Sequence, residues 1–228
     1  MEQTARRLFN RTPGIEQAFC LKRRSVVCVD EGIVGGIHLA GSGVLLPLEE
    51  LEAELKAAGA EELTTHDNCG AFAVRFPGLA DPNSSAVEWG AATAAVLGLP
   101  HRHITAAEMD RPEHLHTAEA IYYDGTGVFN RVPGLPRGFV VSRALFQSAK
   151  NDLALCLQIA FGAHGLGKQF TAGNPLLLVP LAHPTDQRFS PEALESEARE
   201  AARPFGGRVR ISGVKTAWHM RRSAAVAR

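Results

Sequence analysis

The sequence predicts an α/β fold in which a mixed, mainly parallel central sheet is flanked by helices. Three observations support this prediction. Residues 25–30 are a β-branched run with the composition of a buried strand. The segment from Pro47 to Ala58 places leucines on one helical face and is followed by Gly59, a residue suited to a helix C-terminus. Strand-like and helix-like segments then alternate along the chain, as in strands joined by crossover helices.

Local signals predict the other elements in order. Residues 1–24 form an N-terminal arm, helical or irregular, that is broken at a Pro-Gly pair. A helix over 85–97 is expected to be capped by Ser84 or Ser85, and residues 220–228 resemble a loose basic tail. The remaining expected elements are a short strand at 36–40, a strand at 117–123 with a turn at 124–127, a helix at 142–161, a buried strand at 175–182, a helix from Ser190 and a last strand at 208–214.

Length and composition favour a single α/β domain. With 228 residues and 45% hydrophobic content, the chain can bury a substantial core. We expect the N-terminal arm at 1–24, a core at 25–138 and a C-terminal α/β extension at 139–228. The extension would either continue the same sheet or form a small appended layer.

Charge and cysteine content narrow the class of protein further. The 24 basic and 24 acidic residues balance, so no electrostatic footprint for nucleic acid or an anionic membrane stands out. Nothing resembles a signal peptide, and the longest apolar run, 176–181, is too short to span a bilayer. We therefore expect a cytoplasmic protein whose four sparse cysteines are reduced, with Cys20 and Cys156 outside any site.

Two separated motifs supply candidate metal ligands. Cys28 and Asp30 would project from the same face at the end of the first strand, because residues i and i+2 of a strand share a face. His66 and Cys69 would end a second strand at the same edge. Two thiolates and one imidazole are the donors that a tetrahedral Zn²⁺ site prefers. The sequence therefore predicts zinc bound by Cys28, His66 and Cys69, with the Asp30 carboxylate beside it.

These motifs resemble the zinc signature of the β-class carbonic anhydrases. The chain has Cys-x-Asp at 28–30 and His-x-x-Cys-Gly at 66–70. Residues 37–41 lie where that family usually has Arg-Asn-Ala-Gly, and 121–127 is similar to its later Tyr-Asp-x-x-Thr-Gly strand and turn. The resemblance covers about residues 20–130. It also implies a short strand at 61–66, a segment whose own propensity for strand is poor. It implies a β-carbonic-anhydrase-like fold that assembles as a homodimer or a higher homo-oligomer.

The chain departs from the family pattern around the metal. Gly32 occupies the position of the arginine that draws the aspartate away from zinc in that family, and His38 and Leu39 replace the arginine and asparagine of the intermediate segment. With no arginine at position 32, Asp30 is expected to bind zinc directly and to close the resting site. An arginine from elsewhere in the chain, or from a partner subunit, would instead leave the site open.

The resemblance implies a lyase that interconverts carbon dioxide and bicarbonate through zinc-bound hydroxide, with Asp30 as the catalytic orienting group and the backbone amide of Gly70 as a substrate contact. One alternative is hydrolysis of another small heterocumulene, such as carbonyl sulfide or carbon disulfide. A second is a closed, inactive zinc site with a structural or regulatory role, which the missing arginine favours.

Two histidine pairs stand outside these motifs. His101 and His103, and His114 and His116, alternate along extended chain, which would place each pair on one face. Such pairs could form a second metal site or a proton relay. Surface or interface histidines on connecting strands are the simpler interpretation.

Overall fold

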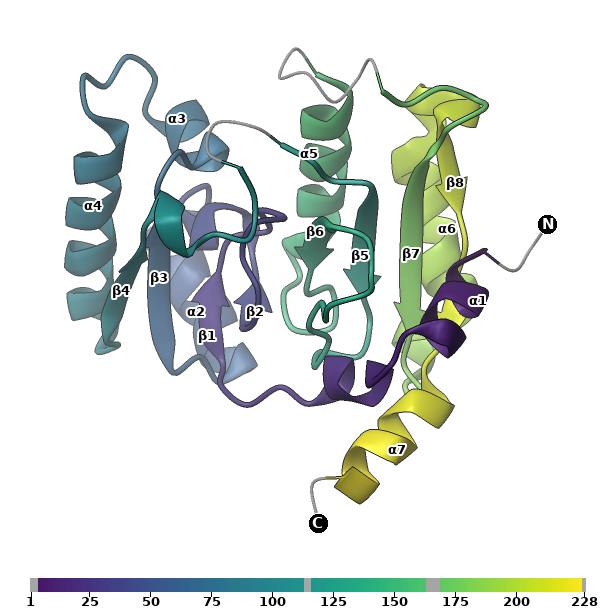
Figure 1. Ribbon diagram of the computed structural model, residues 1–228. Helices are drawn as coiled ribbons and strands as arrows, with labels where there is room; N and C mark the ends of the chain where they lie inside the picture. Colours follow the sequence, from purple (N-terminus) through teal and green to yellow (C-terminus); the bar gives the residue numbers. More distant parts are fainter. Residues whose placement is uncertain (1–3, 113–115, 163–168, 227–228) are drawn as a thin grey trace.

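The computed structural model describes residues 4–112, 116–162 and 169–226, which fold into two parallel sheets that lie side by side (Figure 1). The first sheet has the strand order β2-β1-β3-β4. Its strands are β1 (Ser25–Val27), β2 (Ile37–His38), β3 (Glu62–His66) and β4 (His101–Ile104).

The strand that precedes Cys28 lies at the centre of the first sheet. In β1, Val26 pairs with Ile37 of β2 on one side and with Leu63 of β3 on the other. This confirms the expected neighbours of the first strand. All strand pairs of the described residues are parallel, whereas a mixed sheet was expected. Helices return the chain to the same edge between some of these strands, as α2 does between β2 and β3 and α4 does before β4, whereas β1 and β2, and β5 and β6, are joined without an α-helix.

The helix α2 (Leu48–Ala58) covers the first sheet as predicted, with Leu51 and Leu55 in the core and Gly59 in the left-handed conformation, φ 63°, at its end. The helix α4 (Pro82–Leu97) starts earlier than expected. Asp81 caps it by accepting a hydrogen bond from the Ser84 amide at 3.0 Å, so the sequence prediction chose the wrong cap. The chain also contains α3 (Gly70–Arg75) and the 3-10 helices η2 (Ala40–Gly43) and η3 (Ala106–Glu108).

The second sheet has the order β6-β5-β7-β8, with β9 also paired to β7. Tyr123 of β5 lies in the same core cluster as Leu153 of one helix and Leu194 of another. The elements of this part are β5 (Ala120–Asp124), β6 (Gly138–Val141), α5 (Ala149–Phe161), β7 (Leu176–Ala182), η4 (Gln187–Phe189), α6 (Pro191–Ala202), η5 (Arg203–Arg208), β8 (Val209–Ile211) and β9 (Val214–Lys215).

Polar contacts join the two sheets between β2 and β6. The His38 amide donates to Ser142 Oγ at 2.8 Å, and the Ser142 amide donates to the His38 carbonyl at 3.1 Å. The Val140 amide donates to the carbonyl of Val29 at 3.3 Å. Ser142 forms hydrogen bonds across this junction, and the helix expected from position 142 begins only at Ala149.

The N-terminal segment packs on the face of the second sheet opposite α6, and the C-terminal helix packs against this segment. In Figure 1, α1 (Thr4–Arg11) lies in front of this sheet and α6 behind it. Phe9 of α1 packs near Tyr122, and the His219 ring of α7 (Ala217–Val226) stacks on Phe19 of η1 (Ile15–Phe19), with centroids 5.9 Å apart. The expected loose C-terminal tail is therefore wrong, because these contacts hold a helix there.

Within the described ranges, no helix combines the length and the apolar character needed to cross a membrane.

Candidate metal centre

The three predicted ligands meet at the carboxyl edge of the first sheet. Cys28 follows the last residue of β1, His66 is the last residue of β3, and Cys69 immediately precedes α3. β1 and β3 are adjacent and parallel, so their ends lie at one edge. One ligand atom from each side chain lies within 4.8 Å of the others, and all three residues are buried. The sequence prediction that these residues come together is confirmed.

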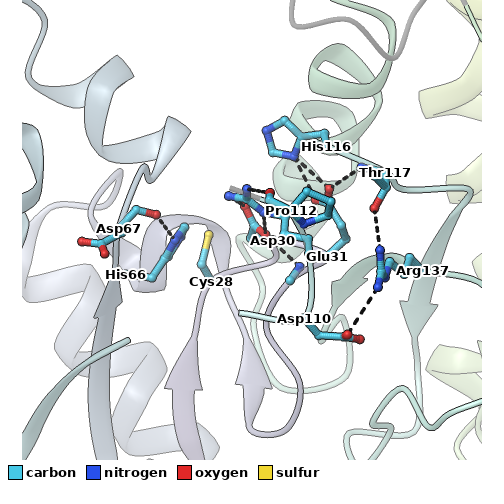
Figure 2. A network of polar contacts seen from close by, with 12 residues as sticks. Cys28, Asp30, Glu31, His66, Asp67, Asp110, Pro112, His116, Thr117 and Arg137 are labelled. Atoms are coloured by element: carbon cyan, nitrogen blue, oxygen red, sulfur yellow. Dashed lines mark hydrogen bonds and ion pairs between the residues drawn. The ribbon is translucent and has the colours of Figure 1, made fainter. Parts of the chain in front are cut away.

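The His66 ring is oriented as a metal ligand is. Its Nδ1–H donates to the Asp67 carbonyl at 2.8 Å, as Figure 2 shows. Its Nε2 is buried and has no hydrogen-bond partner among the described residues. A backbone bond on one ring nitrogen fixes the tautomer and aims the other nitrogen at a metal. A buried unpaired nitrogen is costly in an apolar interior, and this one lies beside the thiols of Cys28 and Cys69, where a bound metal ion would pair it.

The two thiols share one electrostatic environment. The side-chain contact with Cys28, together with the amides of Phe72 and Ala71, lowers the pKa of Cys69 despite burial. The same contact, followed by burial, raises the pKa of Cys28. Cys28 Sγ also accepts a hydrogen bond from the Gly41 amide at 3.2 Å. The pair therefore favours a thiolate on Cys69 and a proton on Cys28.

Burial by itself lowers the pKa of His66, but the adjacent Cys28 and Asp30 outweigh it and raise the pKa to about 8. A cation that bound these side chains would therefore displace protons from them. Two thiols and an imidazole whose free nitrogen faces them are the donor set of a zinc site that keeps a fourth position for another ligand. The residues fit Zn²⁺.

Asp30 is held by an arginine that sequence reasoning missed. Arg111 Nε donates to Asp30 Oδ1 at 2.8 Å and Arg111 Nη2 donates to Oδ2 at 3.1 Å. The Gly32 amide donates to Oδ1 at 2.8 Å. Burial raises the pKa of Asp30, but the hydrogen bonds from Arg111 and Gly32 and the nearby His66 outweigh burial, so the pKa of Asp30 is lowered. The expectation that nothing competes with zinc for Asp30 is therefore wrong.

Gly32 provides the room for this arginine. A Cβ at position 32 would lie 2.6 Å from Arg111 Cγ and 3.0 Å from Met109 Cε. The Gly32 carbonyl accepts a hydrogen bond from the Asp110 amide at 2.7 Å, which docks the arginine-bearing loop. The arginine absent from position 32 is thus replaced in space by one 81 residues from Asp30. The sequence signal that could have prompted a search for another arginine was Gly32, at a position where the resembled family has arginine.

His38 cannot replace that arginine as a cation. Its Nδ1 donates to the Cys28 carbonyl at 2.9 Å, and burial lowers its pKa to about 4. It is therefore neutral near pH 7 and supports the backbone of Cys28. Leu39 is buried in the core.

The first histidine pair has a structural partner. His101 Nε2 and His103 Nδ1 both contact Thr65 Oγ1, at 3.0 and 2.9 Å, and His103 Nε2 contacts Asp67 at 2.9 Å. Their shared face is confirmed, and their bonds tie β4 to β3. His114 of the second pair lies outside the described residues.

A cavity of about 350 Å³ opens beside the ligands. Its polar wall includes Asp30, His116 and the backbone of Gly70. The predicted contact between the Gly70 amide and a substrate stays a prediction. The other residues that line it are mostly apolar and include Ala40, Leu45, Ala71, Val74, Phe139, Leu155 and Ile159.

Comparisons with protein-family models, with curated proteins and with solved structures give no match to this chain. The site must therefore be interpreted from its own geometry.

Proposed function

We propose that this protein is a zinc lyase, similar to the β-class carbonic anhydrases, that interconverts carbon dioxide and bicarbonate. The observation that carries the proposal is the Asp30–Arg111 pair beside the Cys28, His66 and Cys69 group. Bound zinc would lower the pKa of a water from about 16 toward 7 and so supply hydroxide near neutral pH.

The chain's own residues then position the reactants. Arg111 and the Gly32 amide fix the Asp30 carboxylate in one orientation and keep it ionised. An ionised, immobile carboxylate can accept a hydrogen bond from the attacking oxygen and direct its lone pair into the cavity. The apolar walls suit a small uncharged substrate and limit competing water.

The closed structural alternative requires Asp30 to leave its partners. Both of its oxygens accept hydrogen bonds from Arg111, which is itself buried. Breaking a buried ion pair costs roughly 3–5 kcal/mol. This geometry supports the open site over the closed one.

Hydrolysis of a larger heterocumulene such as carbon disulfide is the second candidate. The observation that favours it is the cavity, whose volume of about 350 Å³ and apolar lining leave room for a bulkier and less polar substrate. Carbon dioxide and carbon disulfide would use the same residues, so one set of variants tests both.

The test is stopped-flow hydration of carbon dioxide by the zinc-loaded protein, with carbon disulfide hydrolysis measured in parallel. We expect activity at pH 7 and a loss on the order of 100-fold in kcat/KM for Arg111→Ala, with zinc retained. Arg102→Ala is the matched control, because Arg102 is half exposed and pairs with Glu108 away from the ligands. Zinc-loaded protein that is inactive on both substrates between pH 7 and 9 would refute the proposal and favour a structural zinc site.

A further inference from the structure

A second cavity, of about 1000 Å³, lies between α1 and the second sheet. Its walls come from four chain segments: α1 with the residues directly after it, the loop between β5 and β6, the strand β7 and the strand β8. Figure 1 shows α1 in front of this sheet, beside β7 and β8. The cavity has no lining residue in common with the one beside the metal ligands.

The helix α1 turns a basic face toward this cavity. Arg7 and Arg11 are about one helical turn apart and so lie on the same face, with Leu8 beside them, and all three line the cavity. Ala5 and Phe9 occupy the opposite face and are buried in the core that α1 shares with the second sheet. Because this burial fixes the orientation of the helix, the two guanidinium groups are directed to the cavity.

The second sheet supplies a third arginine. Leu177 of β7 is the register partner of Arg210 of β8, so their side chains lie side by side on one face of the sheet. Leu177 packs with the cluster that contains Phe9, whereas its neighbour Leu176 belongs to the core on the other face. Arg210 therefore projects toward α1, and it lines the cavity together with the two arginines of that helix.

The cavity concentrates positive charge in a chain whose formal net charge is zero. Among the residues that the structure describes, three arginines line it and no aspartate or glutamate does. Within the same ranges, Arg11 and Arg210 take part in no ion pair. A concave surface lined by charge of one sign focuses the electrostatic potential and attracts counterions. Guanidinium groups match phosphate oxygens with pairs of parallel hydrogen bonds.

The rest of the wall suits an uncharged body attached to such an anion. Leu8, Pro13, Pro136 and Leu177 give the cavity an apolar side. A volume of about 1000 Å³ is at the upper end of the range for small-molecule sites and is far more than one inorganic phosphate ion fills. Both leucines are partly buried, so they do not protrude as membrane anchors would.

We infer that this cavity binds a soluble organic phosphate of about nucleotide size. Arg7, Arg11 and Arg210 hold the phosphate oxygens, and the leucine and proline wall packs against the organic body. The ligand bridges α1 and β8 and so ties the N-terminal segment to the second sheet. The inference does not rest on the proposed function, because the two cavities are built from different residues.

Calorimetric titration of the full chain with ATP, inorganic pyrophosphate and adenosine tests the inference. ATP should bind most tightly, because pyrophosphate lacks the organic body and adenosine lacks the charge. Arg210→Ala should weaken ATP binding on the order of 10-fold, since it removes charge-assisted hydrogen bonds. Arg6→Ala is the matched control: it removes the same charge from α1, but Arg6 does not line the cavity.

Three results of this titration would overturn the inference. The first is that ATP does not bind, and the second is that its affinity is the same in Arg210→Ala as in wild type. The third is equal affinity for ATP and pyrophosphate, which would show that the apolar wall takes no part. Vesicles of phosphatidylcholine and phosphatidic acid test a lipid source. Sedimentation with these vesicles that Arg210→Ala abolishes, in a chain that binds no ATP, would assign the arginines to a lipid headgroup instead of a soluble ligand.

A second readout is thermal unfolding with and without excess ATP. A ligand that binds only the folded chain raises its Tm. The rise should be present in wild type and in Arg6→Ala and should be lost or strongly reduced in Arg210→Ala. A rise of equal size in Arg210→Ala would place ATP elsewhere on the protein and overturn the inference.

Discussion

The two sheets treat polar residues at their carboxyl edges in opposite ways. In the first sheet, His66 Nε2 is buried without a partner beside two thiols. In the second sheet, the Asp124 carboxylate at the end of β5 accepts from the Thr126 amide at 2.7 Å, the Thr126 hydroxyl at 2.6 Å and the Phe129 amide at 3.3 Å. The hydrogen bonds to Asp124 stabilise a turn, whereas an unpaired imidazole nitrogen beside two thiols is suited to bind a metal ion.

The strands of the two sheets run in opposite directions, as the arrows of β1 and β7 show in Figure 1. Asp124 is not among the residues whose ligand atoms gather with Cys28, His66 and Cys69. The Tyr-Asp-x-x-Thr-Gly segment of the resemblance forms a turn that Asp124 stabilises, whereas the Cys-x-Asp and His-x-x-Cys segments carry the candidate metal ligands. Four predictions test this contrast.

The largest effect is expected for Cys69→Ser. Wild type should bind about one zinc ion per chain, because ligands from separate elements meet only in the folded state and couple binding to folding. Cys69→Ser should lose both the metal and stability. Elemental analysis and thermal unfolding with and without chelator measure this, with Cys20→Ser, which lies outside the ligand group, as control. Protein purified without metal whose stability is indifferent to chelator would remove the contrast between the two edges.

Asp124→Ala should destabilise the second sheet and leave the metal in place. The substitution removes the acceptor for two amides and a hydroxyl that are buried with it. Each unsatisfied group costs about 1–3 kcal/mol, so we expect a loss of roughly 3–5 kcal/mol in the free energy of unfolding. Urea denaturation of zinc-loaded protein measures it. Loss of zinc together with retained stability would place Asp124 in the metal site and reverse our assignment.

The ligand group was predictable from sequence because the strand before Cys28 follows local rules and the resemblance to a known zinc motif supplied the strand that ends at His66. Cys28 follows a β-branched run, and His66 and Cys69 flank a turn, so parallel pairing of two strands was enough to bring them together. Arg111 was not predictable in this way. It reaches Asp30 from a loop 81 residues away that has no periodic pattern, and only the packing against Gly32 places it there.

The helix boundaries also divide into those set by local sequence and those set by tertiary contacts. α2 matched its prediction because its apolar stripe and terminal glycine are local signals. α5 began late because Ser142 bonds to His38 across the sheet junction, and α7 formed because His219 packs on aromatic rings from the N-terminal arm. Tertiary contacts of this kind override local propensity and leave no mark on a single sequence.

Asp152 of α5 links the two sheets by accepting a hydrogen bond from the Ala40 amide at 2.8 Å. Burial raises its pKa from 3.8 to about 6, and Glu54 adds to the rise. The folded state therefore binds more protons than the unfolded state between about pH 4 and 6, so this residue makes stability fall as pH rises through that window. Asp152→Asn should remove this loss of up to about 3 kcal/mol.

Urea denaturation of wild type and Asp152→Asn at pH 4 and at pH 7 tests the linkage. The difference in the free energy of unfolding should shift in favour of Asp152→Asn as pH increases. A difference that does not change between the two pH values would show that the junction carries no proton-linked cost.

The smallest effect is expected for Gly32→Ala. This substitution tests whether Gly32 leaves the room that Arg111 needs to reach Asp30 at the carboxyl edge of the first sheet. The new Cβ would lie 2.6 Å from Arg111 Cγ, close to the backbone end of that side chain, so the arginine must shift. Overpacking of this kind costs roughly 1–2 kcal/mol. Displacement of Arg111 should also reduce hydration at pH 7 and return activity above roughly pH 8, because the carboxylate that Arg111 releases would then compete for the metal.

A double-mutant cycle with Arg111→Ala isolates the contact: the cost of Gly32→Ala should largely vanish when Arg111 is already truncated. If Gly32→Ala costs the same with and without the Arg111 side chain, the glycine is not there to admit the arginine, and the replacement of the missing family arginine by Arg111 loses its main support.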